Sequence, residues 1–370
     1  MTVSVLKNVN LLSLTSTIAS AAICTVGAFA ALEINNRAEA IVVTGDPNNY
    51  IVSPGTGFDG VVRLDINTNL GSDNCSGSLL STGLHILTAA HCVSDDLGFN
   101  LIINNTKAFF DIPGDTVGID VTKFFIHPNW GGLTDFESVE GDIAILELSS
   151  FAPQAAERYD IYRNNDEVGQ VGIKVGYGLS GQGNQGFDPD NFPFGVKRFG
   201  QNKYDAPAEV LNSRIPELGR VGNNTVPGAV LAYDFDNGLP ENDAFAYFGI
   251  PNLGLGMQEV TTAPGDSGGP TFINGLIAGV TSFGTCFNEP NCSTPPDIDN
   301  FINASFGEFG GDTRVSTYAS YIDDVLAGKI APTKQISEPN TIFGTVFALA
   351  AFAISSRFQR RGKGKARATS

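Results

Sequence analysis

The amino-acid sequence predicts an all-β protein whose body ends in one helix. Short runs rich in Val, Ile, Leu and Phe alternate with clusters of Gly, Asn, Asp and Pro, the pattern of strands and turns. Glycine makes up 43 of 370 residues, roughly 12% against an average of about 7%, which favours many turns. Regularly spaced strands are typical of a β-barrel or sandwich. The expected strands are residues 60–64, 84–88, 100–103, 121–127, 143–148, 171–177, 229–234 and 276–283.

The predicted helix spans residues 316–327. Tyr318, Tyr321, Ile322 and Val325 fall on one face of this segment when it is wound at about 3.6 residues per turn. Such a helix would pack its apolar face against the body.

The composition is that of a globular protein with a strongly acidic body. Hydrophobic residues form 42% and charged residues 16% of the chain, which excludes a disordered or fibrous protein. The net charge is −17, and residues 41–328, with 12 basic and 36 acidic side chains, carry −24. Binding to phosphates requires Lys and Arg, so we expect no nucleic-acid partner. The length suits about two domains, or one unit with two lobes.

Residues 1–40 have the layout of a secretory signal peptide. Lys7 precedes an apolar run of small residues from about 11 to 31, and two small-x-small cleavage sites end at Ala30 and Ala40. We expect a signal peptidase to remove this segment together with Cys24. A core helix or a permanent N-terminal anchor is the alternative.

The C-terminal end is basic and has a different layout. A short linker at 329–336 leads to the tripeptide Ser-Glu-Pro at 337–339, an apolar stretch at 341–354 and six basic residues. The apolar stretch is shorter than the roughly 18–20 residues of a comfortable transmembrane helix, although snorkelling arginines extend it. An amphipathic or buried terminal helix is the alternative.

The order of these features in residues 337–370 resembles the PEP-CTERM sorting tail, although Ser337 replaces the first Pro of the family tripeptide. The resemblance implies transient contact of the tail with the inner membrane and its removal by an exosortase-type processing enzyme. The expected final location is the cell surface, the periplasm or the extracellular space.

Four cysteines remain once the signal peptide is removed: Cys75, Cys92, Cys286 and Cys292. An even number in an exported protein indicates disulfides. Zinc is the competing interpretation, but Cys75 and Cys92 lack a close second pair of ligands. We therefore expect no metal at the cysteines.

Three segments carry the residue types of nucleophilic catalysis. They contain His91 within Leu-Thr-Ala-Ala-His-Cys, Asp142 within Gly-Asp-Ile-Ala, and Ser267 within Gly-Asp-Ser-Gly-Gly-Pro. A serine hydroxyl is a poor nucleophile until a base takes its proton, and an imidazole suits that task near pH 7. A buried carboxylate fixes the imidazole tautomer. Taken singly, these residues could be a core histidine, a turn aspartate and a serine in a Gly-rich turn.

The ordered set of motifs resembles the trypsin/chymotrypsin-like serine proteases over residues 60–328. The resemblance implies that His91 is the general base, Asp142 its orienting carboxylate and Ser267 the nucleophile, with the N–H groups of Gly265 and Ser267 as the oxyanion hole. Other histidines, His85 and His127, match no catalytic position and are expected to be structural.

The same resemblance implies the fold and further pairings. It implies two six-stranded Greek-key barrels, at about 41–151 and 152–328, followed by the helix. Cys75 and Cys92 match the disulfide that braces the histidine loop. Ser282-Phe283-Gly284 matches the segment that pairs with the substrate backbone, and Gly176-Tyr177-Gly178 matches another family motif.

The sequence departs from the family at its activation segment. Family members pair a new N-terminal amine, usually of Ile-Val-Gly-Gly, with the carboxylate before the nucleophile, here Asp266. This chain has Ile-Val-Val-Thr directly after Ala40. Cleavage after Ala40 would create the amine at Ile41, whereas the alternative cleavage after Ala30 would not.

The specificity pocket also departs from trypsin. Thr261 occupies the position at the base of the pocket, and a neutral residue there would not pair with Arg or Lys. Asp312 falls near a pocket-lining position and could restore a negative charge, or it is an exposed loop residue. Ala263 stands where the family often has a cysteine, so Cys286 is expected to pair locally with Cys292.

A long segment between residues 180 and 243 is rich in Gly, Asn, Asp and Pro, as in surface loops that extend a binding site. Residues 234–238, with Asp243, are acidic enough to consider Ca²⁺, although their spacing is not that of an EF-hand. A solvated turn is the alternative, and we predict no metal or organic cofactor.

The sequence thus predicts a secreted serine endopeptidase that hydrolyses peptide or protein substrates through an acyl-enzyme. The alternative is a non-catalytic member of the same fold that acts as a surface-binding or matrix protein. A permanently anchored envelope protein is a more distant possibility.

Overall fold

The computed structural model describes residues 41–68, 71–94, 103–132, 139–213, 226–288 and 291–335, all within one unit that spans Arg37–Ser370. The predicted signal peptide at 1–40 and the predicted sorting tail at 337–370 lie outside the described residues. Within the described part of the chain, no helix is long and apolar enough to cross a membrane.

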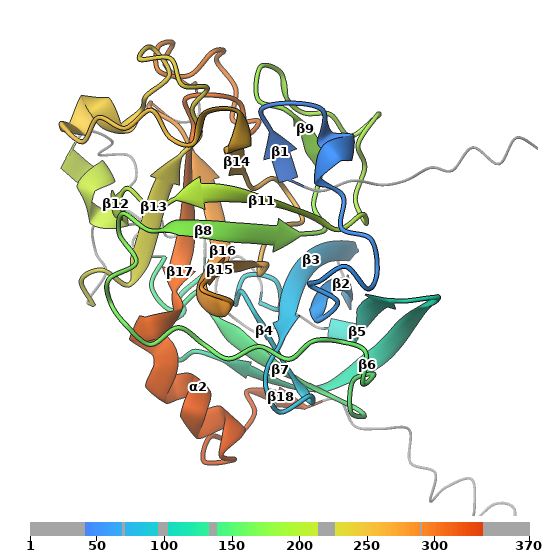
Figure 1. The fold of residues 1–370 in the computed structure, drawn as a ribbon. Coiled ribbons are helices and arrows are strands. Elements are labelled where there is room, and N and C mark those ends of the chain that lie inside the picture. The colour runs from blue at the N-terminus through green and yellow to red at the C-terminus, as the bar shows by residue number, and fades with distance from the viewer. Residues whose placement is uncertain are drawn as a thin grey trace, which may run out of the picture. The chain divides into compact units, whose positions relative to one another are not determined.

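The first sheet is a closed barrel of six strands (Figure 1). Neighbouring strands pair in the order β5, β2, β3, β4, β7 and β6, and pairing of β6 with β5 completes the ring. Side chains of β2 alternate between the core and the surface, with Leu64 and Ile66 buried. The strands are β2 (Val61–Thr68), β3 (Ser72–Leu79), β4 (His85–Thr88), β5 (Ile103–Ile112), β6 (Asp115–Ile126) and β7 (Ala144–Leu148).

The second sheet has seven strands and forms a half-barrel instead of the expected closed barrel. Its strand order is β11, β8, β15, β16, β17, β13 and β12. The two edge strands, β11 and β12, come from one continuous stretch of chain, but the sheet is not closed by a ladder between them. The strands are β8 (Val171–Gly176), β11 (Arg198–Lys203), β12 (Ala206–Pro207), β13 (Val230–Asp234), β15 (Pro270–Ile273), β16 (Leu276–Thr285) and β17 (Phe309–Arg314).

The half-barrel has a local cause. β12 is only two residues long and contains Pro207, which has no N–H to donate to a ladder. Ahead of it, the N–H of Tyr204 bonds to the carbonyl of Gln170 and that of Asp205 to the carbonyl of Ala232. The chain therefore crosses from one edge of the sheet to the other. The mostly β fold class is confirmed, with one closed barrel and one half-barrel.

A third, small sheet brings the first described residues into the molecule. β1 (Ile41–Val43) lies between β9 (Ser180–Gln182), to which it is parallel, and β14 (Val260–Thr261), to which it is antiparallel. β10 (Gly186–Phe187) extends the sheet beyond β9. All three residues of β1 are fully buried, so this strand is part of the core.

The C-terminal helix forms where it was predicted. A 3₁₀ turn, η6 (Val315–Tyr318), leads into α2 (Ala319–Leu326), and Gly328 follows with a φ of +69°. Ile322 and Val325 are buried against the body. After the helix, β18 (Lys334–Gln335) pairs with β6, so part of the segment predicted as a linker is a strand. Further 3₁₀ turns are η1 (Pro47–Tyr50), η2 (Ala208–Ser213), η4 (Phe245–Phe248) and η5 (Gly256–Gln258).

A buried ion pair holds the half-barrel together. Lys174 on β8 donates to Asp312 on β17 at 2.7 Å, and both side chains are almost completely buried. The same carboxylate oxygen accepts the hydroxyls of Tyr204, at 2.6 Å, and Thr271, at 2.5 Å. Burial lowers the pKa of Lys174 against the opposing effect of Asp312.

We predict that Lys174→Met destabilises the protein by about 3–5 kcal/mol, because it leaves a buried carboxylate without its cation. Chemical denaturation measures the change. The control is Lys107→Met, which breaks the 3.2 Å pair with Asp120 where both side chains are exposed; its cost should be at most about 1 kcal/mol. Equal effects of the two substitutions would contradict the prediction.

Candidate active site

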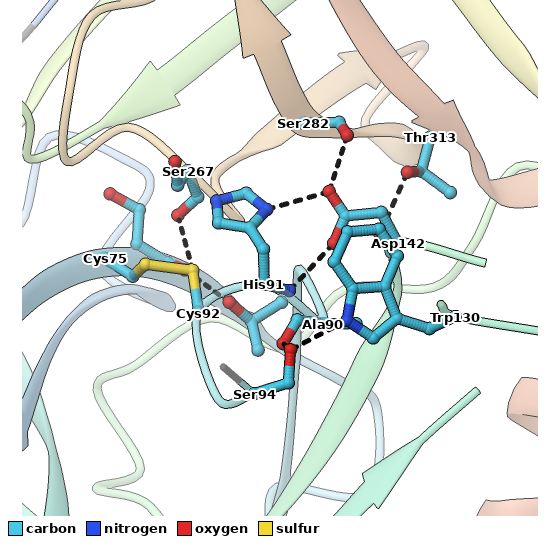
Figure 2. Close-up of polar contacts among 12 residues, drawn as sticks. Cys75, Ala90, His91, Cys92, Ser94, Trp130, Asp142, Ser267, Ser282 and Thr313 are labelled. Atoms are coloured by element: carbon cyan, nitrogen blue, oxygen red, sulfur yellow. Dashed lines mark hydrogen bonds and ion pairs between the residues drawn. A yellow bond between two sulfur atoms is a disulfide. The ribbon is translucent and has the colours of Figure 1, made fainter. Parts of the chain in front are cut away.

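His91 and Asp142 lie together because β4 and β7 are paired. Thr88, the last residue of β4, lies opposite Ala144, the first residue of β7. The residues after β4 and before β7 therefore meet at one end of the barrel. The Nδ1 atom of His91 lies 2.8 Å from Oδ2 of Asp142, and the backbone N–H of His91 donates to Oδ1 at 2.9 Å (Figure 2). One carboxylate thus fixes both the ring and the backbone of the histidine.

The second lobe completes the surroundings of Asp142, which is fully buried. The hydroxyl of Ser282 on β16 donates to its Oδ2 at 2.5 Å, and that of Thr313 on β17 donates to its carbonyl at 2.9 Å. The bond from Ser282 helps to satisfy the buried carboxylate, and both bonds join the two sheets at the site.

Asp142 controls the proton affinity of the histidine. Burial lowers the pKa of His91, but the charge of Asp142 and its hydrogen bond raise it more, so the pKa lies above the usual 6.5. About 15% of the imidazole is exposed. His91 can therefore accept a proton and hold it as a stabilised cation.

Ser267 lies in the turn between β14 and β15. Its carbonyl accepts the N–H of Ser76 on β3 at 2.8 Å, and Cys92 Sγ lies 3.6 Å from it without a hydrogen to donate. Figure 2 shows Ser267 on the side of the imidazole opposite Asp142. Within the described residues, the hydroxyl of Ser267 makes no hydrogen bond to His91. Such contacts are often long in proteins without substrate.

The turn around Ser267 presents two unpaired backbone donors. Among the hydrogen bonds of the described residues, neither the N–H of Gly265 nor that of Ser267 has an acceptor. Gly265 has a φ of +94°, and a Cβ there would lie 2.9 Å from the Cα of Gly178. Glycine is therefore required, and the two free donors suit an oxyanion.

Asp266 points away from the site and into the core. Its carboxylate accepts the N–H groups of Gly178 at 2.8 Å and Ala263 at 2.9 Å, and also bonds to the backbone of Ile41. Burial raises its pKa to about 7, against the effect of these donors. The structure thus brings Ile41 and Asp266 together, as the activation hypothesis requires.

A cavity of about 340 Å³ opens beside Ser267. Its lining includes every residue predicted to bind substrate, namely Thr261, Ser282, Phe283 and Gly284. Ser282 has a second contact that the sequence did not indicate, its hydrogen bond to Asp142.

Neither expectation for Asp312 is correct. Asp312 is not a lining residue of this cavity and is not exposed, because it is buried on β17 in the ion pair with Lys174. Sequence reasoning instead missed Glu308, the carboxylate in the cavity wall. Its Oε1 accepts the N–H groups of Asn303 and Ser305, both at 2.9 Å. No motif marks this turn, so the sequence carried no signal for Glu308.

The remaining predicted residues are placed as follows. Cys75–Cys92 and Cys286–Cys292 are disulfides, as expected, so their sulfurs are not available as metal ligands. His85 contacts Thr82 on the barrel, and the ring of His127 packs edge-on against two tyrosines of the C-terminal helical segment. Both histidines make structural contacts.

Comparisons with known proteins agree with this architecture. The trypsin family model matches residues 53–197, which include His91 and Asp142 and end before Ser267. A trypsin of the mite Tyrophagus putrescentiae is 26% identical over 82% of this chain and 89% of its own length. An uncharacterized peptidase of Corynebacterium glutamicum is also 26% identical, over 85% of this chain and 86% of its own length.

Among solved structures, neuropsin, a serine protease expressed in the limbic system of mouse brain, matches with a TM-score of 0.50 and 17% identity. The match covers 75% of this chain and 98% of neuropsin. The fold is therefore chymotrypsin-like. The family model and the related sequences confirm the resemblance to the trypsin-like serine proteases.

The charge of Glu308 should make the preference of the cavity for basic side chains depend on pH. Burial raises its pKa to about 7, so the carboxylate becomes charged as the pH rises through that value. Cleavage after Lys or Arg, relative to Leu, should rise by about fivefold between pH 6 and 8. Over this range the charged fraction of Glu308 rises from about one tenth to about nine tenths, and a partly shielded ion pair contributes about 1.4 kcal/mol. Peptide assays of kcat/KM measure the ratio.

Glu308→Gln should remove this dependence on pH. The ratio of cleavage after Phe to cleavage after Leu serves as the internal control, because neither side chain responds to the pocket charge. A wild-type ratio of Lys to Leu that stays constant with pH would contradict the role of Glu308.

Proposed function

We propose that this chain is a secreted serine endopeptidase that hydrolyses peptide bonds through a Ser-His-Asp triad. The observation that carries the proposal is the pair of contacts between the buried carboxylate of Asp142 and His91, one to the ring Nδ1 and one to the backbone N–H. An imidazole fixed through Nδ1 directs its other nitrogen to the cleft as a base. Ser267 lies on that side of the ring (Figure 2).

The proposed reaction has two steps. The hydroxyl of Ser267 attacks the scissile carbonyl while His91 takes its proton, and the N–H groups of Gly265 and Ser267 bind the resulting oxyanion. His91 then gives the proton to the leaving amine, which departs as the acyl-enzyme forms. A water molecule, deprotonated by His91, hydrolyses the acyl-enzyme and restores the serine.

The substrate is proposed to bind in an extended form. Phe283 and Gly284 lie on β16 beside the cavity, where a peptide strand can add to a sheet edge through main-chain hydrogen bonds. The side chain before the scissile bond would enter the cavity lined by Thr261 and Glu308.

A peptide-library cleavage assay tests the triad. Ser267→Ala should abolish acyl-enzyme formation, and Asp142→Asn should lower kcat by about 10⁴-fold because it favours the wrong imidazole tautomer. Ser149→Ala, at an exposed serine after β7, is the matched control and should retain full activity. No cleavage by wild type or control would favour the non-catalytic, surface-binding alternative.

The pH profile gives a second readout of the same proposal. Because Asp142 raises the pKa of His91 above 6.5, the base is protonated at a higher pH than a free histidine. Activity should therefore fall as the pH drops through the raised pKa. An acidic limb governed by a pKa below 6.5 would contradict the assignment of His91.

We also propose that cleavage after Ala40 activates the enzyme by creating the amine of Ile41. Ile41 is fully buried, and its backbone already bonds to Asp266. A positive α-ammonium there would pair with the buried carboxylate and stabilise the turn that carries Ser267.

Proteins that begin at Ile41 and at Ala31 test this activation route. The first should be active, whereas the second should be at least about 100-fold less active, since about 2.7 kcal/mol of ion pairing would be missing. Asp266→Asn in the Ile41 protein is the control and should also lose activity. Equal activity of the two wild-type forms would refute the hypothesis.

Export and C-terminal processing remain part of the proposal. The two disulfides favour an oxidising compartment, which agrees with a signal peptide at 1–40. A signal peptidase and an exosortase-type enzyme would process the two ends, with transient membrane contact through the tail at 337–370.

A further inference from the structure

A cluster of buried carboxylates lies behind the cavity, away from the triad. Oxygens of Asp234, Asp236 and Glu259 all lie within 4.8 Å of one another, and the three side chains are at most 1% exposed. The carboxylate of Asp205 interacts directly with that of Asp234 and is 8% exposed. Four acidic groups therefore meet in the core. Only a positive charge or bound protons could compensate them.

In each carboxylate of this cluster, one of the two oxygens accepts hydrogen bonds from N–H groups. Backbone N–H groups of Ala244 and Phe245 bind Oδ2 of Asp234, and that of Gly238 binds Oδ1 of Asp236. A side-chain amide at Asn252 binds Oδ1 of Asp205. The side chains are thus oriented before any ligand binds.

The other oxygens are left without partners. Oδ1 of Asp234, Oδ2 of Asp236 and Oδ2 of Asp205 are buried and accept no hydrogen bond in the described part of the chain. Unpaired buried acceptors are rare and costly in folded proteins. Three such atoms in one cluster point to a ligand that accepts electron pairs.

From this geometry we propose that Asp234, Asp236 and Glu259 form a Ca²⁺ site, with Asp205 beside Asp234. A Ca²⁺–oxygen distance is about 2.3–2.6 Å. Two oxygens bound to one Ca²⁺ ion can therefore lie at most about 4.6–5.2 Å apart. The oxygens of Asp234, Asp236 and Glu259, all within 4.8 Å of one another, meet this condition. Mg²⁺ usually keeps several waters and takes one or two carboxylates, so three carboxylates favour Ca²⁺.

Neighbouring charged groups do not replace the ion. Nζ of Lys203 lies 3.9 Å from Oδ1 of Asp205 and is partly exposed, which leaves the cluster strongly negative. Asp243 is not a ligand, because its two oxygens bind the N–H groups of Ala246 and Asn252.

The site is placed to brace the specificity cavity. Glu259 directly precedes β14, whose Thr261 lines the cavity, and Asp234 is paired with Phe309, another lining residue. One ion would therefore fix the two sides of the cavity, at Thr261 and at Phe309, relative to each other. β14 also pairs with β1, so the ion would support the buried strand that begins at Ile41. This consequence for substrate binding rests on the proposed function, whereas the metal site does not.

Calcium binding is tested directly on the full-length chain carrying Ser267→Ala, which prevents self-cleavage and needs no activity. After EDTA treatment and dialysis, isothermal titration with CaCl₂ should show one ion per chain. CaCl₂ at about 100 times Kd should raise Tm by about 5–10 °C. MgCl₂ and ZnCl₂ at the same concentration should have much smaller effects.

Asp236→Asn, added to the same chain, should remove both the titration signal and the Tm shift. Without calcium this variant should be at least as stable as its parent, because one repelling charge is gone; a role limited to the bond with Gly238 would instead lower Tm. Glu241→Gln is the matched control, since it removes one exposed charge from the same loop and should keep the full response.

Glu259→Gln provides a second ligand variant if Asp236→Asn does not fold, and it too should lose calcium binding. Absence of calcium binding to the parent chain would overturn the proposal. The same holds for an unchanged response in a folded ligand variant, or for stabilisation by Zn²⁺ and not by Ca²⁺.

Discussion

The buried carboxylate of Asp266 is the constraint on which the candidate site depends. It accepts backbone hydrogens from its own turn at Ala263, from Gly178 after β8 and from Ile41 at β1. Burying a carboxylate is costly, and the donors offset that cost only if all three segments are in place. The turn then presents the N–H groups of Gly265 and Ser267 to the cleft. Ser267 is thus positioned by residues distant in sequence, on the side of the turn away from the cleft.

The glycines around Asp266 follow from the same constraint. A Cβ at Gly176 would lie 2.1 Å from Oδ1 of Asp266, and one at Gly178 would lie 2.5 Å from its backbone nitrogen. Neither contact is tolerable, so the Gly-Tyr-Gly motif serves the approach of this carboxylate. Tyr177 between them donates to Asp111 of the first barrel at 2.9 Å. The motif therefore connects the turn that carries Ser267 with the other lobe.

The sequence predicted those parts whose signals are local. Runs of apolar residues between turn residues predicted strands such as the first half of β2, and helical periodicity predicted the C-terminal helix. β3 and β17 were not predicted, because β3 is rich in Ser and Asn and β17 contains Gly310, Gly311 and Asp312. Their burial comes from cross-sheet contacts and not from hydrophobic side chains. The partner of Asp312 could not be predicted either, because Lys174 lies 138 residues away in the sequence.

The motifs also located His91, Asp142 and Ser267, but not what surrounds them. The contact of Ser282 with Asp142, the position of Glu308 in the cavity and the convergence of Asp205 with Glu259 all join residues from separate strands or turns. Such contacts depend on register across the sheets, which one sequence does not determine. The half-barrel differs from the expected second barrel for a similar reason, since closure depends on the two-residue strand at Pro207.

The most direct test of the account is the crystal structure of the protein that begins at Ile41 after reaction with a peptidyl phosphonate. The account predicts a covalent bond from phosphorus to Oγ of Ser267, with the phosphoryl oxygen about 2.7–3.1 Å from the nitrogens of both Gly265 and Ser267. His91 should remain bonded to Asp142. An unmodified Ser267, or a phosphoryl oxygen directed away from both nitrogens, would contradict it.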